Sequence, residues 1–284
     1  MTAPPREISG GSDLARRLAK SDEGHKYKYG HLLVLSGGPG NGGAARLSAR
    51  AGLRIGAGLV TLVCPIDALV ENAAQLTSVM VRDLEEPDDL NEMLQDERIN
   101  AICLGPGLGL DDDARALVRI ALAGRRAAVL DADAITAFAG APMGLIAQLH
   151  DNVVLTPHQG EFRRLFPDIA GSETSQITQC QAAAKLSGAV VLLKGTETVV
   201  AAPDGRCATH VARGDDATPW LATAGSGDVL AGLIAGLLAR GFGPFAAACD
   251  ATWIHAAAAR NFGPGLIAED LPDLVPSVLR DLGL

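Results

Sequence analysis

The chain has 284 residues, of which 48% are hydrophobic, and 33 Asp and Glu residues outweigh 24 Lys and Arg residues for a net charge of −9. This balance excludes a protein that holds nucleic acid through a basic surface, and no apolar run approaches the ~20 residues that cross a membrane. Five scattered cysteines and an N-terminus without a signal-peptide pattern predict a cytoplasmic protein with reduced, buried thiols.

Short β-rich runs alternate with longer helical patterns from residue 31 onward. The stretch 189–205 is typical of a strand that turns into a hairpin, which 206–212 completes. In chain order, the other expected strands lie in 31–38, 59–65, 99–109, 127–135 and 152–161, and the expected helices lie in 44–58, from Ile66 onward and in 111–124. This alternation predicts a three-layer αβα sandwich with a mostly parallel sheet, and we expect one domain over residues 1–284.

Small and polar residues gather where these apolar runs end. Parallel sheets bind ligands beyond the carboxyl ends of their strands, so we expect the clusters to line one edge of the sheet. They are "SGGPGNGG", "GPGLG", "DADA", "TPHQGE", "KGTET" and "TAGSGD". Their convergence predicts a ligand site more strongly than any one cluster does.

The apolar helix expected in 221–241 begins with Gly225, Ser226, Gly227 and Asp228. An acid in the first turn would stabilise the helix dipole by only ~0.3–1 kcal/mol, which is an ordinary structural feature. Alternatively, the three residues before the acid form an anion loop whose N–H groups bind a phosphate, with Asp228 beside the reacting atoms. This short stretch leaves both interpretations open.

Four further candidates carry alternatives of their own. The glycine-rich segment 36–45 either cradles a phosphate or forms a tight turn, and it lacks the ending of a P-loop. His158 either donates a hydrogen bond to substrate or is an ordinary loop residue. In "DADA", either Asp131 orients a substrate hydroxyl or a hydrated cation, or the segment is structural and Asp133 is an ordinary N-cap. Lys194 ends a very apolar strand, where an unpaired charge is costly, and this favours a phosphate partner.

The ordered set of clusters resembles one family, the ADP-dependent NAD(P)H-hydrate dehydratases of ribokinase-like fold. The similarity runs from "HKYKYGHLLVLSGG" to "GPGLIAEDLPDLVPSVL" and includes "GNGGAARLSARAGLRIGAGLVTL", "VLDADAI", "NVVLTPHQGE", "VVLLKGTETVV" and "ATAGSGDVLAGLIAGLLARG". The chain departs from the family pattern at "KYKYG", at Gln159 in place of proline, at "TPW" in 218–220, and at Ala224 in place of glycine.

The resemblance implies a reaction. The S-form of NADH hydrate (NADHX) or NADPH hydrate (NADPHX) would be dehydrated to NADH or NADPH, while ADP is converted to AMP and phosphate. Mg²⁺ is implied with the nucleotide, and its ligands are unknown. Also implied are a homotetramer, or at least a homo-oligomer, and a separate NAD(P)H-hydrate epimerase that acts in the same pathway.

The resemblance also implies roles for individual residues. Asp228 would act as the base that deprotonates the hydrate hydroxyl as it attacks the β-phosphate, and the anion loop Gly225, Ser226 and Gly227 would stabilise the transferring phosphoryl group. Nucleotide contacts are implied for Lys194, Gly195, Thr196, Glu197, Thr198 and Gly227. Hydrate contacts are implied for Ala44, Ala45, Gly107, His158 and Asp228.

Two other functions share these features. A ribokinase-like kinase of a vitamin-precursor alcohol would use the same anion loop and base but keep the phosphorylated product. A catalytically silent nucleotide-binding protein would have no need of Asp228 together with Lys194. The long glycine-rich segment after residue 35 favours the dehydratase over the kinase.

Overall fold

The computed structural model describes residues 4–21, 24–172 and 174–284. The strands are β1 (Arg6–Glu7), β2 (His31–Leu35), β3 (Leu59–Cys64), β4 (Met80–Asp83), β5 (Ile99–Leu104), β6 (Ala127–Leu130), β7 (Val153–Leu155), β8 (Val190–Leu193), β9 (Glu197–Ala201) and β10 (Cys207–Val211). The α-helices are α1 (Ser12–Leu18), α2 (Gly43–Arg54), α3 (Leu69–Gln75), α4 (Asp89–Met93), α5 (Asp112–Ala123), α6 (Asp133–Thr136), α7 (Met143–Ile146), α8 (Gln159–Leu165), α9 (Pro167–Ala170), α10 (Gln176–Ser187), α11 (Ser226–Ala239), α12 (Pro244–Phe262) and α13 (Asp270–Asp281). Short 3₁₀ helices are η1 (Lys26–Tyr29), η2 (Ile66–Ala68), η3 (Gly214–Asp216) and η4 (Pro219–Leu221).

The strands form one ten-stranded sheet in the order β1-β10-β9-β8-β7-β6-β5-β2-β3-β4. Strand β9 runs antiparallel to both β8 and β10, as the predicted hairpin requires, and the other neighbours pair in parallel. From β2 the chain first builds outward through β3 and β4, and it then returns to place β5 on the other side of β2. The strand order therefore reverses between β2 and β5, where open parallel sheets form a ligand crevice.

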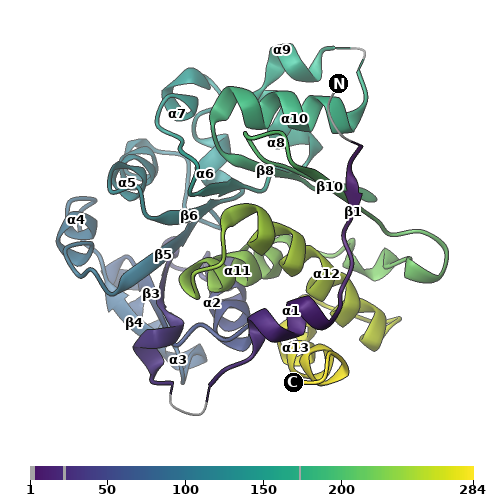
Figure 1. The fold of residues 1–284 in the computed structure, drawn as a ribbon. Coiled ribbons are helices and arrows are strands. Elements are labelled where there is room, and N and C mark those ends of the chain that lie inside the picture. The colour runs from purple at the N-terminus through teal and green to yellow at the C-terminus, as the bar shows by residue number, and fades with distance from the viewer. Residues whose placement is uncertain (1–3, 22–23, 173) are drawn as a thin grey trace.

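Side chains of the central strands alternate between two buried faces. In β2, Leu32 and Val34 belong to one core cluster, whereas Leu33 and Leu35 belong to the other. The first cluster includes residues of α2, α11, α12 and α13, and the second includes residues of α5, α8 and α10. Figure 1 shows these two groups of helices on opposite sides of the sheet. The predicted three-layer αβα architecture is confirmed.

Helices α2 and α11 pack closely because glycines lie at their contact. A Cβ atom at Gly232 would lie 2.2 Å from the carbonyl oxygen of Ser48, and one at Gly236 would lie 2.7 Å from that of Gly52. The Ser48 hydroxyl also donates a hydrogen bond to the backbone carbonyl of Asp228 at 2.8 Å. These contacts fix the first turn of α11 against α2.

Several elements lie where the sequence patterns predicted none, among them β1, β4, α1, α10, α12 and α13. All five cysteines are buried and free, as predicted. Within the described residues, no helix has both the length and the apolar character needed to cross a membrane.

Candidate functional site

The loops that follow β2 and β5 touch at the point where the strand order reverses. A Cβ atom at Gly37 would lie 1.7 Å from the carbonyl oxygen of Gly107, and one at Gly107 would lie 2.5 Å from that of Asn41. Gly107 also has a φ of 71°, a left-handed conformation that favours glycine. The glycines of both clusters thus serve a close backbone contact, which supports the tight-turn interpretation of 36–45.

The two alanines predicted to contact the hydrate differ in their exposure. Both lie in the first turn of α2. Ala45 is fully buried and belongs to the core cluster, whereas Ala44 keeps part of its surface open. Of the two, Ala44 is the residue whose side chain a ligand can reach.

Lys194, Asp131 and the first turn of α11 come together beyond the ends of β6 and β8. The Lys194 ammonium donates to Asp131 Oδ1 at 2.7 Å, and Asp131 is only 1% exposed. A Cβ atom at Gly227 would lie 3.3 Å from Lys194 Nζ and 3.9 Å from Asp131 Oδ2. Lys194 therefore has a carboxylate partner, and two of its three N–H donors remain for a ligand.

Asp228 lies in the same cluster and has a strongly altered acidity. The pKa of Asp228 is raised to about 6, chiefly by burial and also by the charge of Asp131, while the charge of Lys194 opposes the rise. A general base works best when its pKa lies near the operating pH. Asp228 thus has the environment that such a role requires.

The turn between Asp131 and α6 is strained. Ala132 has φ 46° and ψ −114°, a conformation that costs an L-residue about 1–3 kcal/mol. The predicted helix cap at Asp133 is wrong, because Ala132 holds the N-cap position. Asp133 instead accepts a hydrogen bond from the backbone N–H of Gly109 at 3.0 Å. The strained turn thereby places one carboxylate at Lys194 and the next at the loop after β5.

His158 has a structural role that neither sequence interpretation included. Its Nδ1 accepts hydrogen bonds from the N–H groups of Gly160 at 2.8 Å and Glu161 at 3.3 Å. Glu161 in turn accepts from the backbone N–H of His158 at 2.8 Å, which completes a capping box at the start of α8. Because Nδ1 accepts, the neutral ring carries its proton on Nε2, 3.4 Å from Glu161 Oε1. The backbone of His158 pairs with that of Lys194, which brings these two candidates side by side.

The N-terminus of α11 has no side-chain cap. Its N-cap is Gly225, with φ 89°, and a Cβ atom there would lie 2.7 Å from Leu47 Cδ1 and 2.8 Å from Ala268 Cβ. The Ser226 hydroxyl donates to the Leu221 carbonyl at 2.7 Å instead of accepting from the helix. The Ser226 N–H donates a long hydrogen bond to the Thr223 carbonyl at 3.4 Å, and the other N–H groups of this turn are available to an anion, as the anion-loop interpretation requires.

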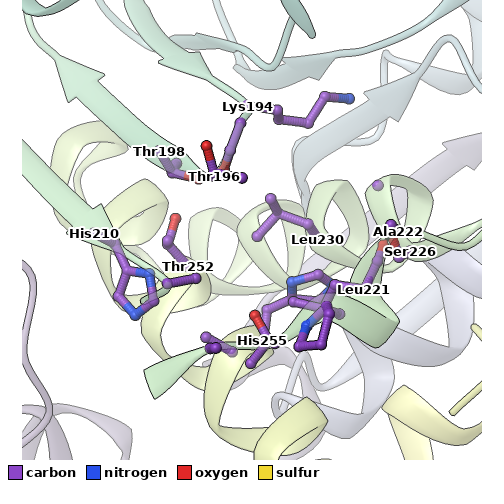
Figure 2. Close-up of a pocket in the computed structure, with 17 residues that line it drawn as sticks. Lys194, Thr196, Thr198, His210, Leu221, Ala222, Ser226, Leu230, Thr252 and His255 are labelled. Carbon is purple, nitrogen blue, oxygen red and sulfur yellow. Dashed lines mark hydrogen bonds between the residues drawn. The ribbon is translucent and has the colours of Figure 1, made fainter. Parts of the chain in front are cut away.

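A cavity of about 430 Å³ opens beside this N-terminus (Figure 2). Its lining includes five of the residues predicted to bind nucleotide, namely Lys194, Gly195, Thr196, Thr198 and Gly227. Glu197 lies outside this lining, and its carbonyl accepts a hydrogen bond from Gln176. The cavity continues along the loop 217–222 and α12.

Four polar cavity residues were not among the sequence candidates: His210, Thr218, Thr252 and His255. They come from β10, the loop before η4 and α12, and only His255 carried a signal, as a lone histidine in an alanine-rich segment. Across the described residues, no group of three or more His, Cys, Asp or Glu side chains is arranged to hold a metal ion.

Relatives of known description cover nearly the whole chain. The family model described as NAD(P)H-hydrate dehydratase matches residues 32–275. The bifunctional NAD(P)H-hydrate repair enzyme of Moorella thermoacetica is 40% identical over 95% of this chain, and that of Salinibacter ruber is 38% identical over 97%. The chain spans about half the length of these relatives, 52% and 53% respectively.

Solved structures agree with this assignment. An ADP/ATP-dependent NAD(P)H-hydrate dehydratase from Bacillus subtilis, co-crystallised with ATP and Mg²⁺, has a TM-score of 0.80 at 26% identity over 99% of this chain and 100% of its own. A ribokinase-like superfamily protein from Enterococcus faecalis has a TM-score of 0.82 at 25% identity over 98% of this chain and 96% of its own. The resemblance and ribokinase-like fold expected from the sequence are confirmed: the chain belongs to the NAD(P)H-hydrate dehydratase family.

Proposed function

We propose that this chain dehydrates the S-form of NADH hydrate or NADPH hydrate and uses ADP as the phosphoryl donor. The observation that carries the proposal is the placement of Asp228, with its pKa raised to about 6, in the uncapped first turn of α11 beside the Lys194–Asp131 pair. A base, a cation and free N–H donors then surround one point beside the cavity. Phosphoryl transfer needs this combination of positioning and charge stabilisation.

In the proposed first step, the Asp228 carboxylate takes the proton from the hydrate hydroxyl. The hydroxyl oxygen bonds to the β-phosphorus of ADP, and the bond from that phosphorus to the oxygen bridging to the α-phosphate breaks, which releases AMP. N–H groups of the anion loop and the free Lys194 donors stabilise the charge on the transferring group. In the second step, the ring nitrogen expels phosphate, and loss of a proton from the adjacent carbon restores the double bond.

The residues present fit a magnesium ion that arrives with the nucleotide. Mg²⁺ is usually held by one or two carboxylates together with phosphate oxygens and water. Asp131 and Asp228 offer such hard oxygen donors close together, and their mutual repulsion contributes to the raised pKa of Asp228. The ion would supply charge neutralisation on the phosphates.

The remaining candidates lie at the ends of three other strands. Ala44 and Gly107 follow β2 and β5, where the strand order reverses, and His158 follows β7 beside Lys194; none of the three lines the nucleotide cavity, and we assign them to the hydrate. The loop contact at Gly107 forms one wall, and the proton on His158 Nε2 is a donor for a substrate oxygen. We further propose that the active form is a homo-oligomer. We also propose that a separate NAD(P)H-hydrate epimerase acts in the same pathway.

The test supplies NADH hydrate with Mg²⁺ and either ADP or ATP, and follows the near-UV absorbance of reduced nicotinamide. We expect recovery with ADP and release of AMP and phosphate. Recovery with ATP alone would keep the reaction and contradict the donor. With neither donor active, the proposal fails, and a screen of small alcohols for a stable phosphorylated product would then examine the kinase alternative.

A further inference from the structure

A second cavity, of about 590 Å³, lies at the opposite edge of the sheet from the proposed active site. Its lining includes the first residues of three strands, His31 in β2, Leu59 in β3 and Ile99 in β5. The proposed reaction takes place at the carboxyl ends of the strands and uses none of these groups. Helix α4 and strand β4, which add Met93 and Met80 to the lining, lie at the same end of the sheet in Figure 1.

The floor of this cavity is one face of the sheet. Leu33 pairs with Thr61, and Thr61 pairs with Met80, so these three side chains point to the same side of neighbouring strands. Arg82 follows Met80 by two residues on β4 and therefore points to that side as well. Part of this face stays open over β3 and β4, and the floor combines apolar side chains with a hydroxyl and a cation.

His31 and Thr61 form a buried polar pair on this floor. His31 Nε2 and Thr61 Oγ1 lie 2.8 Å apart, and the two residues are 7% and 2% exposed. Within the described residues, no hydrogen bond reaches His31 Nδ1, and this atom is not among the unpartnered atoms that are fully enclosed. Burial lowers the pKa of His31, so the ring is neutral near pH 7. A ligand in the cavity can therefore satisfy Nδ1 with an ordinary hydrogen bond.

Two cations without a carboxylate partner also line the cavity. They are Lys26 of η1 and Arg82 of β4, and in the described part of the chain no carboxylate lies within 4.0 Å of either. Arg98 lines the cavity as well, but Asp96 offsets its charge by accepting from Nε and Nη2 at 2.8 Å each. The cavity thus has an excess of positive charge in a chain whose net charge is −9, and this excess favours an anion.

Apolar groups supply the remaining walls. The ring of Tyr27 lies 5.2 Å from Lys26 Nζ and 5.1 Å from Arg98 Cζ, which ties η1 to the segment before β5. Tyr27 is 40% exposed and Met80 is 43% exposed, so both present apolar surface to a ligand. Apolar walls with a few convergent polar groups are typical of sites that hold a small organic molecule.

We infer that this cavity is a binding site for a small organic anion. The charged group of the ligand pairs with Lys26 and Arg82. Its apolar body lies against Leu33, Met80 and Met93. A bare inorganic anion would leave the apolar floor uncovered, and a neutral molecule would leave both cations unpaired. The inference is independent of the proposed function, because it concerns the other edge of the sheet.

The methionines of the chain provide the test. There are four, of which Met80 and Met93 line the cavity, whereas Met143 lies on α7 outside the lining and is 62% exposed. Protein labelled with ¹³C at the methionine methyl groups is titrated by NMR with 2-naphthoate and with 2-naphthamide, which has the same body without the charge. We expect 2-naphthoate to shift the Met80 and Met93 signals saturably and to leave Met143 in place. The amide should bind about 10-fold more weakly, the value of one hydrogen bond to a charged group.

Arg82→Gln and Arg280→Gln form a matched pair of variants. Both arginines are exposed, and within the described residues neither has a carboxylate within 4.0 Å. Arg280 lies on α13, which packs on the other face of the sheet. Arg82→Gln should weaken binding of 2-naphthoate about 10-fold and leave that of 2-naphthamide unchanged, whereas Arg280→Gln should change neither.

Three results would each overturn the inference. The first is that the Met80 and Met93 signals stay in place or move together with that of Met143. The second is equal affinity for the carboxylate and the amide, and the third is an equal loss of 2-naphthoate affinity in both variants. None of them bears on the proposed reaction, which is tested separately by the return of reduced nicotinamide.

Discussion

Helices α8 and α11 both begin at the ligand-binding edge of the sheet, yet their first turns are built in opposite ways. His158 and Glu161 close a capping box on α8, so the N–H groups of Gly160 and Glu161 are satisfied within the protein. The N-cap of helix α11 is Gly225, which has no side chain to act as a cap. Because every helix starts with unpaired N–H groups, the helix that the chain leaves uncapped is the one that can bind an anion.

Glu161 and Asp228, the acids in the first turns of α8 and α11, also differ in role. Glu161 is 5% exposed and is used by the cap, where it accepts the His158 N–H. Asp228 lies beside Asp131 and Lys194, and burial raises its pKa. One helix start is thus structural and the other reactive, and four substitutions test this division.

The largest expected effect is that of Asp228→Asn. We expect turnover of the hydrate to fall about 10²–10⁴-fold, the usual contribution of a general base, with ADP affinity retained. Single-turnover kinetics and calorimetry measure the two quantities. Near-normal turnover would contradict the assignment of Asp228 as the base.

The same variant should be more stable at pH 7. The folded pKa of about 6 exceeds the usual value of 3.8, so the fold disfavours the charged carboxylate, and this destabilisation grows as pH rises through that window and then stays constant. Removing the charge should raise the free energy of unfolding by up to about 2 kcal/mol, allowing for partial solvent exposure. Unfolding in urea at pH 4 and pH 7 should show the gain at the higher pH alone.

Gly225→Ala should give the next largest effect, and the two ends of α11 provide its control. Gly225 precedes the helix with φ 89°, and Gly241 follows it with φ 88°, but only a Cβ at Gly225 meets other atoms within 4 Å. Gly241→Ala should cost about 1–2 kcal/mol of unfolding free energy from its backbone conformation alone. Gly225→Ala should cost about 1–3 kcal/mol more from the collision with Leu47 and Ala268, and it should also lower turnover. Equal losses of stability and full activity in both variants would remove the special role of this turn.

Asp131→Asn should move the pH dependence of the reaction. In the unsubstituted protein, kcat/KM should fall as pH drops below about 6, because protonation removes the Asp228 base. The charge of Asp131 raises the pKa of Asp228, and Asp131 also pairs with Lys194. In the Asp131→Asn variant, the fall of kcat/KM should therefore shift to lower pH. Asp133→Asn is the control, since Asp133 raises the same pKa less, and its shift should be smaller. An acid limb that stays in place in Asp131→Asn would show that the two carboxylates are not coupled.

The sheet and the edge that carries the site were predictable because both depend on local patterns. Buried strands appear in the sequence as apolar runs, and small residues follow the end of each run. The clusters "KGTET" and "TAGSGD" could therefore be assigned to one edge of the sheet without knowledge of the strand order. The ion pair of Lys194 with Asp131 could not be predicted, because it joins side chains 63 positions apart whose strands are brought together only by the sheet order. His255 was missed because its only signal, a lone histidine in an alanine-rich segment, does not show that other elements form a cavity beside it.

His158 shows why a residue on the right edge can still be assigned incompletely, and its substitution should have the smallest effect on stability. His158→Asn should keep the cap, because Asn is among the best N-cap residues, whereas His158→Ala should lose about 1 kcal/mol of unfolding free energy. If Nε2–H also donates to the hydrate, both variants should raise KM for the hydrate by about 3- to 10-fold with little change in ADP affinity. Stable His158→Asn protein with an unchanged KM would mean that the imidazole serves α8 alone, and the division between the structural and the reactive helix start would then be complete.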